Sequence, residues 1–179
     1  MNDKEFEIFI ESHIGIPRQG PGNNDQTKKA LDLLKNDVPV NPEILDIGCG
    51  AGMQTLELAR NLNCKIIAID LYQQFLDQLM AQAKSENLAH KIITQNQSMF
   101  ELDFEAERFD IIWSEGSIYL YGFEKGLKEW SKYLKKGGYF AISECSWLVD
   151  TVSPEPQKYW AENYPQMKTI PQNLEVIKN

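Results

Sequence analysis

Cysteine is scarce in this sequence, which argues against a disulfide-stabilised fold and against a metal site built from cysteines. The chain has 3 cysteines among 179 residues. This odd number with no metal-type spacing does not suit a disulfide framework and favours a reducing cytosol. Cys49 lies within a glycine-rich stretch, and we interpret it as a small buried side chain, not as a reactive thiol. The sequence contains neither a metal-ligand cluster nor a nucleophilic triad, so we predict no metal site.

Basic residues and long apolar runs are also few. The 18 lysines and arginines are outnumbered by 26 aspartates and glutamates, which gives a net charge of -8. This charge argues against a nucleic-acid partner gripped by a broad basic face. No apolar run approaches the roughly 20 residues of a membrane span, and the start MNDKE does not have the pattern of a signal peptide. We therefore expect a soluble, cytoplasmic protein that binds neither nucleic acid nor a membrane.

The most informative stretch is ILDIGCGAG, from Ile44 to Gly52. Its apolar residues predict a short buried strand over 44–47. Glycine then recurs at positions 48, 50 and 52, and helical spacing of apolar residues begins at Met53. A strand, a glycine-rich turn and a helix in this order present backbone N–H groups and a helix N-terminus to a nucleotide-like ligand. Glycine lets the backbone approach the ligand closely.

A second predicted strand, KIIAID, ends at Asp70. Asp70 follows Gly48 by 70 − 48 = 22 positions. This is close to the offset of about 20 residues expected of the acidic residue that binds a ribose. A carboxylate at the tip of that strand can accept hydrogen bonds from both ribose hydroxyls. The two motifs together predict a nucleoside-type ligand.

The spacing of the glycines indicates which nucleoside. Dinucleotide-binding proteins use G-x-G-x-x-G/A, which would place a third small residue at position 53. Position 53 is a methionine, and the third glycine comes one residue early, at Gly52. Asp46 lies two residues before the first glycine, so the motif is D-x-G-x-G-x-G. It resembles the first motif of the class I S-adenosylmethionine-dependent methyltransferases of small-molecule type.

This resemblance implies the cofactor S-adenosylmethionine and a set of residues that bind it. Asp46, Gly48, Gly50 and Gly52 would hold its amino-acid end, and Asp70, followed by Leu71, would bind its ribose. Other matches extend from residue 17 to about 165. The first is RQGPG, which precedes a threonine and a helix, and the second is the segment past the third strand, where the family reads adenine. The other two are the stretches FDIIW and LKKGG.

These further matches add candidate cofactor contacts. Arg18 and Gln19, in RQGPG, either belong to a linker or contact the cofactor from a loop that folds over it. Ser98 and Met99 take the place of the acid with which many family members bind the adenine amine. Glu115, just past the fourth predicted strand, completes the cofactor-binding set.

Candidate substrate-side residues lie past the same strand, because open α/β sheets bind ligands outside the carboxyl ends of their strands. Glu115 and Tyr119 follow FDIIW, and His13 is a third candidate from the N-terminal segment. Each could orient a substrate or take its proton. The alternatives are a solvated carboxylate for Glu115 and surface packing for Tyr119, so no residue is assigned as catalytic.

The predicted fold is α/β: a Rossmann-like three-layer sandwich with a mostly parallel sheet and helices on both faces. Predicted helices cover 2–14, 27–36, from 53 onward, 72–86, 122–135, 157–162 and 172–178, and predicted strands cover 44–47, 65–70, 92–94, 108–114 and 139–145. We expect Gly137-Gly138 to end the helix over 122–135 with a left-handed cap.

The resemblance also shows a departure at the C-terminus. The family's sheet ends in an antiparallel hairpin beside the fifth strand, but the residues after Asp150 show no strand alternation. Either the chain is a fragment or another element covers that strand, which would otherwise present an exposed edge. We expect one domain over 1–179, with an N-terminal helical and lid segment over 1–36, a cofactor-binding core over 37–148 and an incomplete C-terminal segment over 149–179.

The sequence thus predicts methyl transfer from S-adenosylmethionine to an unidentified acceptor, expected to be a small molecule. One alternative is a non-catalytic or truncated S-adenosylmethionine-binding domain, favoured by the missing hairpin. An NAD-dependent oxidoreductase is the other, and Met53 argues against it. A homodimer remains open.

Overall fold

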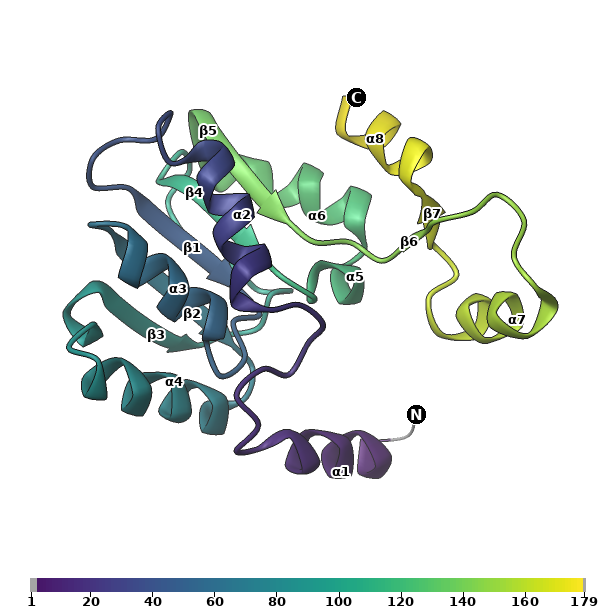
Figure 1. Ribbon diagram of the computed structural model, residues 1–179, viewed down its shortest axis with the longest axis horizontal. Helices are drawn as coiled ribbons and strands as arrows, with labels where there is room; N and C mark the ends of the chain where they lie inside the picture. Colours follow the sequence, from purple (N-terminus) through teal and green to yellow (C-terminus); the bar gives the residue numbers. More distant parts are fainter. Residues whose placement is uncertain (1–2, 179) are drawn as a thin grey trace.

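A five-stranded parallel sheet forms the centre of the computed structural model, which describes residues 3–178 (Figure 1). The strand order is β3-β2-β1-β4-β5, and every neighbouring pair is parallel. The strands are β1 (Glu43–Ile47), β2 (Lys65–Asp70), β3 (Ile92–Asn96), β4 (Phe109–Ser114) and β5 (Leu134–Ile142). Helices lie on both faces, which confirms the predicted fold class.

Each face of the sheet has its own apolar core, because strands buried on both sides are rich in isoleucine and leucine. On one face, α2 (Asn24–Leu34), α3 (Met53–Asn61) and α4 (Gln73–Ser85) contribute buried residues such as Leu31, Leu56 and Leu76. On the other face, α5 (Ile118–Tyr121) and α6 (Phe123–Trp130) cover the sheet, with Phe123 and Trp130 buried.

The order of the strands creates a crevice at one end of the sheet. From β1 the chain moves outward through β2 to β3, and it then returns to the opposite side of β1 as β4. The connections from β1 and β4 therefore diverge at the carboxyl ends of the two strands, where open α/β sheets bind their ligands. All the predicted cofactor residues except the N-terminal Arg18 and Gln19 lie on or just after β1, β2, β3 or β4.

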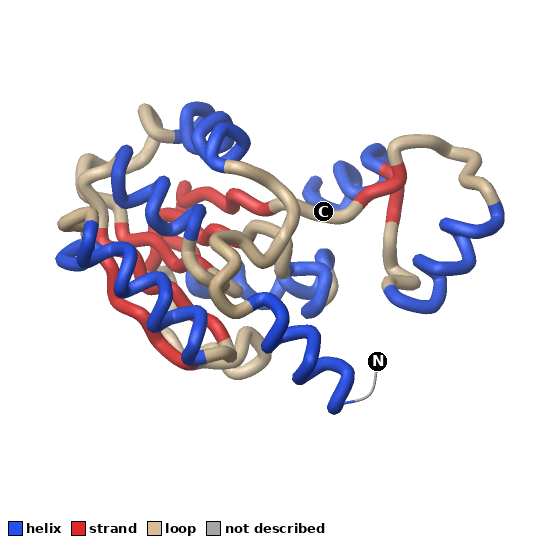
Figure 2. The backbone as a smooth tube through the Cα atoms, turned by 60° about the horizontal axis from the view of Figure 1, so that its bottom comes forward, coloured by secondary structure: helices blue, strands red, loops and turns tan. Residues whose placement is uncertain are grey.

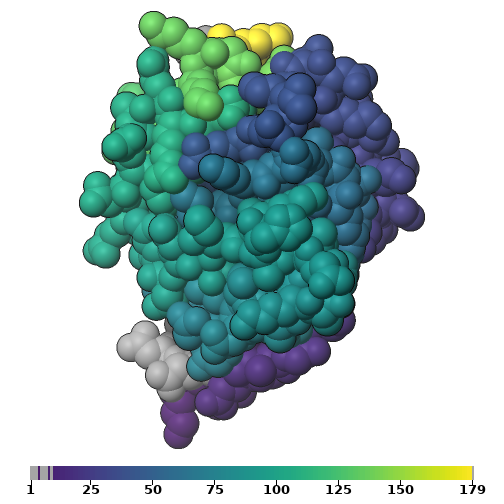
Figure 3. Space-filling view, turned by 90° about the vertical axis from the view of Figure 1, so that its left-hand side faces the viewer, coloured from purple at the N-terminus to yellow at the C-terminus, as the bar shows by residue number. Residues whose placement is uncertain are grey.

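The N-terminal segment comprises α1 (Asp3–His13), a loop over 14–23 and α2. The predicted start of the second helix, at residue 27, was three residues late. Asn23 caps α2, because its side chain accepts a hydrogen bond from the backbone N–H of Gln26. The loop is attached to α4 by Gln78, which accepts from Gly15 N and donates to Ile16 O. Figure 3 shows α1 at one end of the molecule, beside the residues of α4.

The prediction that Gly137-Gly138 caps a helix was wrong. The helix α6 ends at Trp130, a 3-10 turn η2 (Ser131–Tyr133) follows, and β5 already begins at Leu134. Both glycines lie inside β5, where the register with β4 shifts: Phe109 pairs with Leu134, but Ile111 pairs with Tyr139. Gly137 has a φ of +78° at this irregularity. A Cβ at Gly138 would lie 2.9 Å from the backbone oxygen of Asp110, so the close pairing requires glycine there.

Residues after β5 form a separate arm that extends from the sheet (Figure 2). It consists of β6 (Ser146–Trp147), α7 (Pro154–Asn163), β7 (Lys168–Thr169) and α8 (Ile170–Lys178), and β6 pairs with β7 in parallel. Over residues 3–178, no strand pairs with the outer edge of β5. The two helices predicted over 157–162 and 172–178 are present and begin two or three residues earlier. Within the same range, no helix has the length and apolar character needed to cross a membrane.

Candidate cofactor site

The glycine loop between β1 and α3 depends on close packing against two neighbours. A Cβ placed on Gly48 would lie 2.6 Å from Ser117 Cβ, and one placed on Gly52 would lie 2.2 Å from Leu79 Cδ1. Gly52, with a φ of +79°, also precedes the first residue of α3. Larger residues at either position would push α5 or α4 away from the loop.

Every backbone N–H of this loop is already satisfied within the chain. Gly48 and Cys49 both donate to Ile69 O, each at 2.9 Å, and Gly52 donates to Cys49 O at 3.0 Å. Gly50 donates to Asp70 Oδ2 at 2.8 Å. The loop therefore differs from the expected arrangement, in which free N–H groups face the ligand.

The remaining loop N–H, that of Ala51, donates to Gln19 Oε1 at 2.7 Å. Gln19 reaches the loop from the N-terminal segment, and its Nε2 donates to Ile16 O at 2.6 Å. A Cβ placed on Gly50 would lie 2.6 Å from Gln19 Oε1. The side chain of Gln19 thus lies directly on the glycine loop.

Asp70 joins the end of β2 to the glycine loop. In addition to the Gly50 bond, its Oδ1 accepts from the backbone N–H of Tyr72 at 3.0 Å. Burial raises the pKa of Asp70, and the backbone hydrogen bonds oppose that shift. Leu71, the next residue, is 58% exposed. The carboxylate therefore lies at the tip of the strand, as the prediction of a ribose-binding residue requires.

Asp46 lies beneath the loop and is fully buried. Its Oδ2 accepts a hydrogen bond from Thr55 Oγ1 at 2.5 Å, while its Oδ1 has no partner among the described residues. Burial is the largest cause that raises the pKa of Asp46 to about 7, and the charge of Glu115 adds to it. The first acid of the motif is therefore an incompletely satisfied buried carboxyl group.

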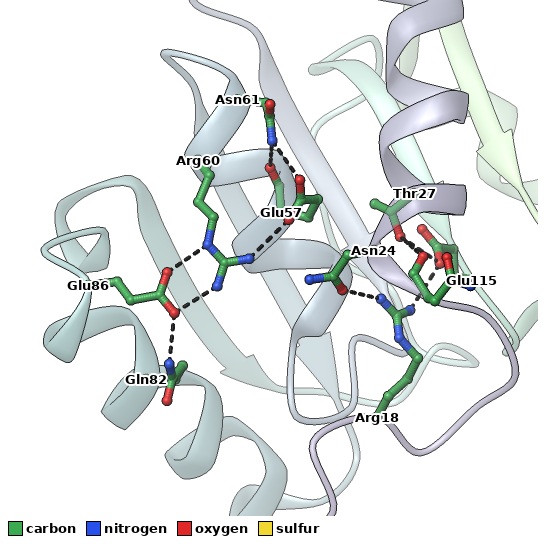
Figure 4. Close-up of polar contacts among 10 residues, drawn as sticks. Arg18, Asn24, Thr27, Glu57, Arg60, Asn61, Gln82, Glu86 and Glu115 are labelled. Carbon is green, nitrogen blue, oxygen red and sulfur yellow. Dashed lines mark hydrogen bonds and ion pairs between the residues drawn. The ribbon is translucent and has the colours of Figure 1, made fainter.

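Arg18 and Glu115 form an ion pair that holds the N-terminal segment over the tip of β4 (Figure 4). Arg18 Nη1 lies 3.1 Å from Glu115 Oε2, and its Nη2 donates to Asn24 Oδ1 at 3.0 Å. Thr27 Oγ1 donates to the same oxygen of Glu115, and Trp113 Nε1 donates to the other one. Because three side chains, Arg18, Thr27 and Trp113, donate to it, Glu115 is not a solvated loop carboxylate. The other network in Figure 4, around Arg60, joins α3 to α4.

The residues predicted to read adenine, Ser98 and Met99, follow β3. Met99 Cε would be 3.4 Å from a Cβ at Gly48, and Met99 packs against the core on the α6 face. Ser98 Oγ accepts from the backbone N–H of Phe100 at 3.2 Å. Met99 is thus placed beside the loop, and Ser98 is placed in the turn that follows β3.

The other two candidate substrate-side residues, Tyr119 and His13, lie in different parts of the molecule. Tyr119, in α5, is half-buried, and its burial raises the pKa of its hydroxyl. Its ring contacts that of Tyr164 edge to face, with centroids 5.8 Å apart. His13 ends α1, and its backbone oxygen accepts from Gln19 Nε2 at 3.4 Å. The structure therefore brings His13 to the N-terminal loop and Tyr119 to the C-terminal arm.

Several residues that hold the site together were not predicted. Ser117 Oγ donates to Ile47 O at 2.8 Å and accepts from Ser114 Oγ at 2.7 Å, which ties the tip of β4 to that of β1. Ser143 Oγ accepts from the backbone N–H of Gly116 at 2.8 Å and ties β4 to the end of β5. No local pattern distinguishes these serines from loop serines. The threonine after RQGPG was a signal for Thr27, which binds Glu115.

Comparison of the chain with known proteins identifies its family. Residues 44–138 match the methyltransferase domain family. The chain belongs to that family. The match confirms the family predicted from the glycine motif, and S-adenosylmethionine is the cofactor this family uses. Among the described residues, no group of three or more histidine, cysteine, aspartate or glutamate side chains could hold a metal ion.

Individual proteins and solved structures are similar to this chain over most of its length. The sterol 24-C-methyltransferase of Candida albicans is 30% identical over 116 residues, which are 64% of this chain and 30% of that protein. The structure of YjhP from E. coli has a TM-score of 0.81 at 20% identity, over 92% of this chain and 67% of that one. Phosphoethanolamine N-methyltransferase 2 of Haemonchus contortus, solved with S-adenosyl-L-methionine, has a TM-score of 0.76 at 22% identity. The similarity covers 96% of this chain and 40% of that one. The chain thus spans about a third of the Candida albicans protein.

Proposed function

We propose that this chain binds S-adenosylmethionine at the glycine loop and transfers its methyl group to a small-molecule acceptor. The observation that carries the proposal is the chemistry of the loop. Its N–H groups are satisfied inside the chain, and the acids Asp46 and Asp70 lie beneath it and beside it. A dinucleotide would bring two negative phosphates to a site without free donors. S-adenosylmethionine brings a sulfonium and an ammonium group, whose positive charges favour the ionised forms of the two carboxyl groups and are then attracted by them.

The chain's own residues have separate parts in this proposal. Asp70 accepts hydrogen bonds from the ribose hydroxyls, because each of its oxygens has a lone pair beyond the one used by Gly50 or Tyr72. Met99 packs on the adenine, with Ser98 or a neighbouring backbone group as its polar partner. Leu71 borders the ribose from the exposed side. Asp46 and the glycine loop hold the amino-acid end.

The N-terminal segment closes the site in this account. Arg18 and Gln19 lie over the tip of β4 and over the loop, and Glu115 fixes Arg18 there. When bound, the cofactor supplies a methyl group activated by the positive charge on its sulfur. The protein then aligns the acceptor with that methyl group and excludes water from it.

The acceptor is proposed to be a small molecule that enters between the tips of β4 and β5. The net charge of -8 argues against a nucleic acid. The names of the similar proteins include methyltransferases of sterols, of phosphoethanolamine and of ribosomal protein L11, so membership of the family does not select one acceptor. The three free cysteines support a reducing, cytoplasmic location. A homodimer remains open.

One observation favours a second candidate function. The outer edge of β5 is unpaired over residues 3–178, where the resemblance leads us to expect a hairpin. If the hairpin is needed to complete the acceptor pocket, the chain binds the cofactor but transfers nothing.

A transfer assay separates the two candidate functions. The chain is incubated with S-adenosylmethionine carrying a labelled methyl group and with separate pools of small amines, alcohols, thiols and carboxylic acids. Formation of S-adenosylhomocysteine above the protein-free rate with one pool supports the enzyme. Binding of the cofactor without turnover in any pool supports the non-catalytic reading.

A further inference from the structure

A second cluster of polar and aromatic side chains lies where the chain leaves β5. Tyr164, at the end of α7, donates a hydrogen bond from its hydroxyl to Glu144 Oε1 at 2.7 Å. The ring of Tyr164 meets that of Tyr119 at an angle of 73°. Three distant segments of the chain therefore converge: α5, the exit of β5 and the end of α7.

The other oxygen of Glu144 is the unusual member of this cluster. Oε2 is buried and accepts no hydrogen bond within residues 3–178, and no ion pair found in that range includes Glu144. Burial raises the pKa of Glu144, as expected of a carboxyl group that lacks a compensating charge. Glu115 and Asp70, in contrast, accept from two or more donors each. The cluster thus has an unused acceptor beside two aromatic rings.

The cluster is adjacent to the proposed cofactor site. Ser143, the neighbour of Glu144, accepts from the backbone N–H of Gly116 at 2.8 Å. Ser117, two residues before Tyr119, packs against Gly48 of the glycine loop. Glu144 and Tyr119 are therefore each within two residues of a side chain that contacts the tip of β4 or the glycine loop.

One member of the cluster, Tyr164, also borders a hollow, which neither Glu144 nor Tyr119 lines. This hollow of about 210 Å³ lies between α6 and the C-terminal arm. One cation also lines this hollow, Lys168, and it is paired with Glu124 at 3.1 Å. Aromatic faces and a carboxylate are the groups with which proteins bind ammonium ions.

We propose that Glu144, Tyr119 and Tyr164 bind a cationic nitrogen of the methyl acceptor, which places the acceptor among molecules that carry an ammonium group. The atom that takes the methyl group is a different one with a lone pair, because an ammonium nitrogen has none. Glu144 Oε2 accepts from an N–H group of the acceptor, and the rings of Tyr119 and Tyr164 contact its ammonium group. The inference rests on the proposed function for the role of the ligand as acceptor. Binding of an amine at these three residues is measurable without methyl transfer.

The experiment titrates the whole chain with three probes of similar size, butylammonium chloride, butan-1-ol and sodium butyrate, and follows the aromatic NMR signals of the tyrosines. We expect the signals of Tyr119 and Tyr164 to move with butylammonium at a concentration at least about tenfold lower than with butan-1-ol. Glu144→Gln retains an oxygen that can accept from Tyr164 but removes the negative charge. It should therefore weaken the binding of butylammonium by about tenfold. Glu162→Gln removes the same charge from an exposed position on α7 and should leave the affinity unchanged.

Two results would overturn the inference. One is movement of the tyrosine signals of the wild-type chain at equal concentrations of butylammonium and butan-1-ol. This test uses the wild-type chain alone and does not depend on the folding of a variant. The other is equal loss of butylammonium affinity in Glu144→Gln and Glu162→Gln. A parallel titration with S-adenosylmethionine keeps the two claims apart. Cofactor binding without amine preference overturns only the inference. Amine preference without cofactor binding overturns the proposed function, and with it the role of the ligand as acceptor, but leaves the amine site.

Discussion

The side-chain oxygen of Gln19 lies 2.7 Å from the backbone nitrogen of Ala51 and accepts its hydrogen bond, although 32 positions separate the two residues. The N-terminal segment is therefore in direct contact with the glycine loop. Any ligand that reaches the loop from this side must contact Gln19 or displace it. The neighbouring residue, Arg18, fixes the same segment through its ion pair with Glu115.

The first prediction concerns this ion pair. Arg18→Met and Glu115→Gln should each lower the free energy of unfolding by about 1–3 kcal/mol, because the pair is mostly buried and each change leaves polar groups without partners. Urea unfolding of the two single variants and the double variant measures the coupling, expected at about 0.5 kcal/mol or more. Additive effects would show that the two side chains do not interact in solution.

The second prediction tests Asp70. Asp70→Ala should weaken S-adenosylmethionine binding by at least about 1.5 kcal/mol, because charge-assisted hydrogen bonds to the ribose are lost. Calorimetry gives the dissociation constant, and Asp77→Ala removes an exposed acid of the neighbouring helix α4 as the control. Unchanged affinity in Asp70→Ala would remove this residue from the ribose site.

The third prediction separates ligand contact from backbone strain at Gly50. Gly50 has a φ of +54° and Gly137 a φ of +78°, so alanine at either position should lower stability by about 1 kcal/mol. A Cβ at Gly50 enters the space of Gln19, whereas a Cβ at Gly137 meets nothing within 4 Å. Thermal unfolding and calorimetry should therefore show similar destabilisation but loss of cofactor binding in Gly50→Ala alone. Equal binding by both variants would mean that the ligand does not approach Gly50.

The fourth prediction follows from the burial of Asp46, which raises its pKa from 3.8 to about 7. Between these values the folded chain keeps a proton that the unfolded chain has lost, so this group stabilises the fold at low pH. Its contribution is lost as the pH rises to about 7 and is constant above it. The stability difference between wild type and Asp46→Asn should fall across this window by up to about 1.4 kcal/mol per pH unit. A difference that is flat from pH 4 to 7 in urea unfolding would contradict the buried, protonated Asp46.

Local patterns predicted the part of the fold that surrounds the glycine loop. Strand β2 has the predicted bounds, β1 and α4 agree within one residue at each end, and α3 begins at the predicted Met53. The placement of Asp70 at a strand tip followed from the alternation of one strand and one helix, which depends on nearby residues only. RQGPG was predicted to lie in a linker or a loop, and it lies between α1 and α2, in the loop over residues 14–23.

Contacts between distant segments could not be predicted. Glu115 meets Arg18 across 97 positions, and Tyr164 meets Glu144 from a proline-rich segment with no regular pattern. Gly137-Gly138 was misread because two glycines after an amphipathic helix also suit a helix cap. Only the pairing of β5 with β4 shows that they belong to a strand irregularity.

The central claim, that the glycine loop binds S-adenosylmethionine and not a dinucleotide, is tested most directly by calorimetric titration of the chain with S-adenosylmethionine and with NADH. We predict a dissociation constant on the order of micromolar for S-adenosylmethionine and no measurable heat with NADH. Saturable binding of NADH would contradict the account, and so would the absence of binding by S-adenosylmethionine.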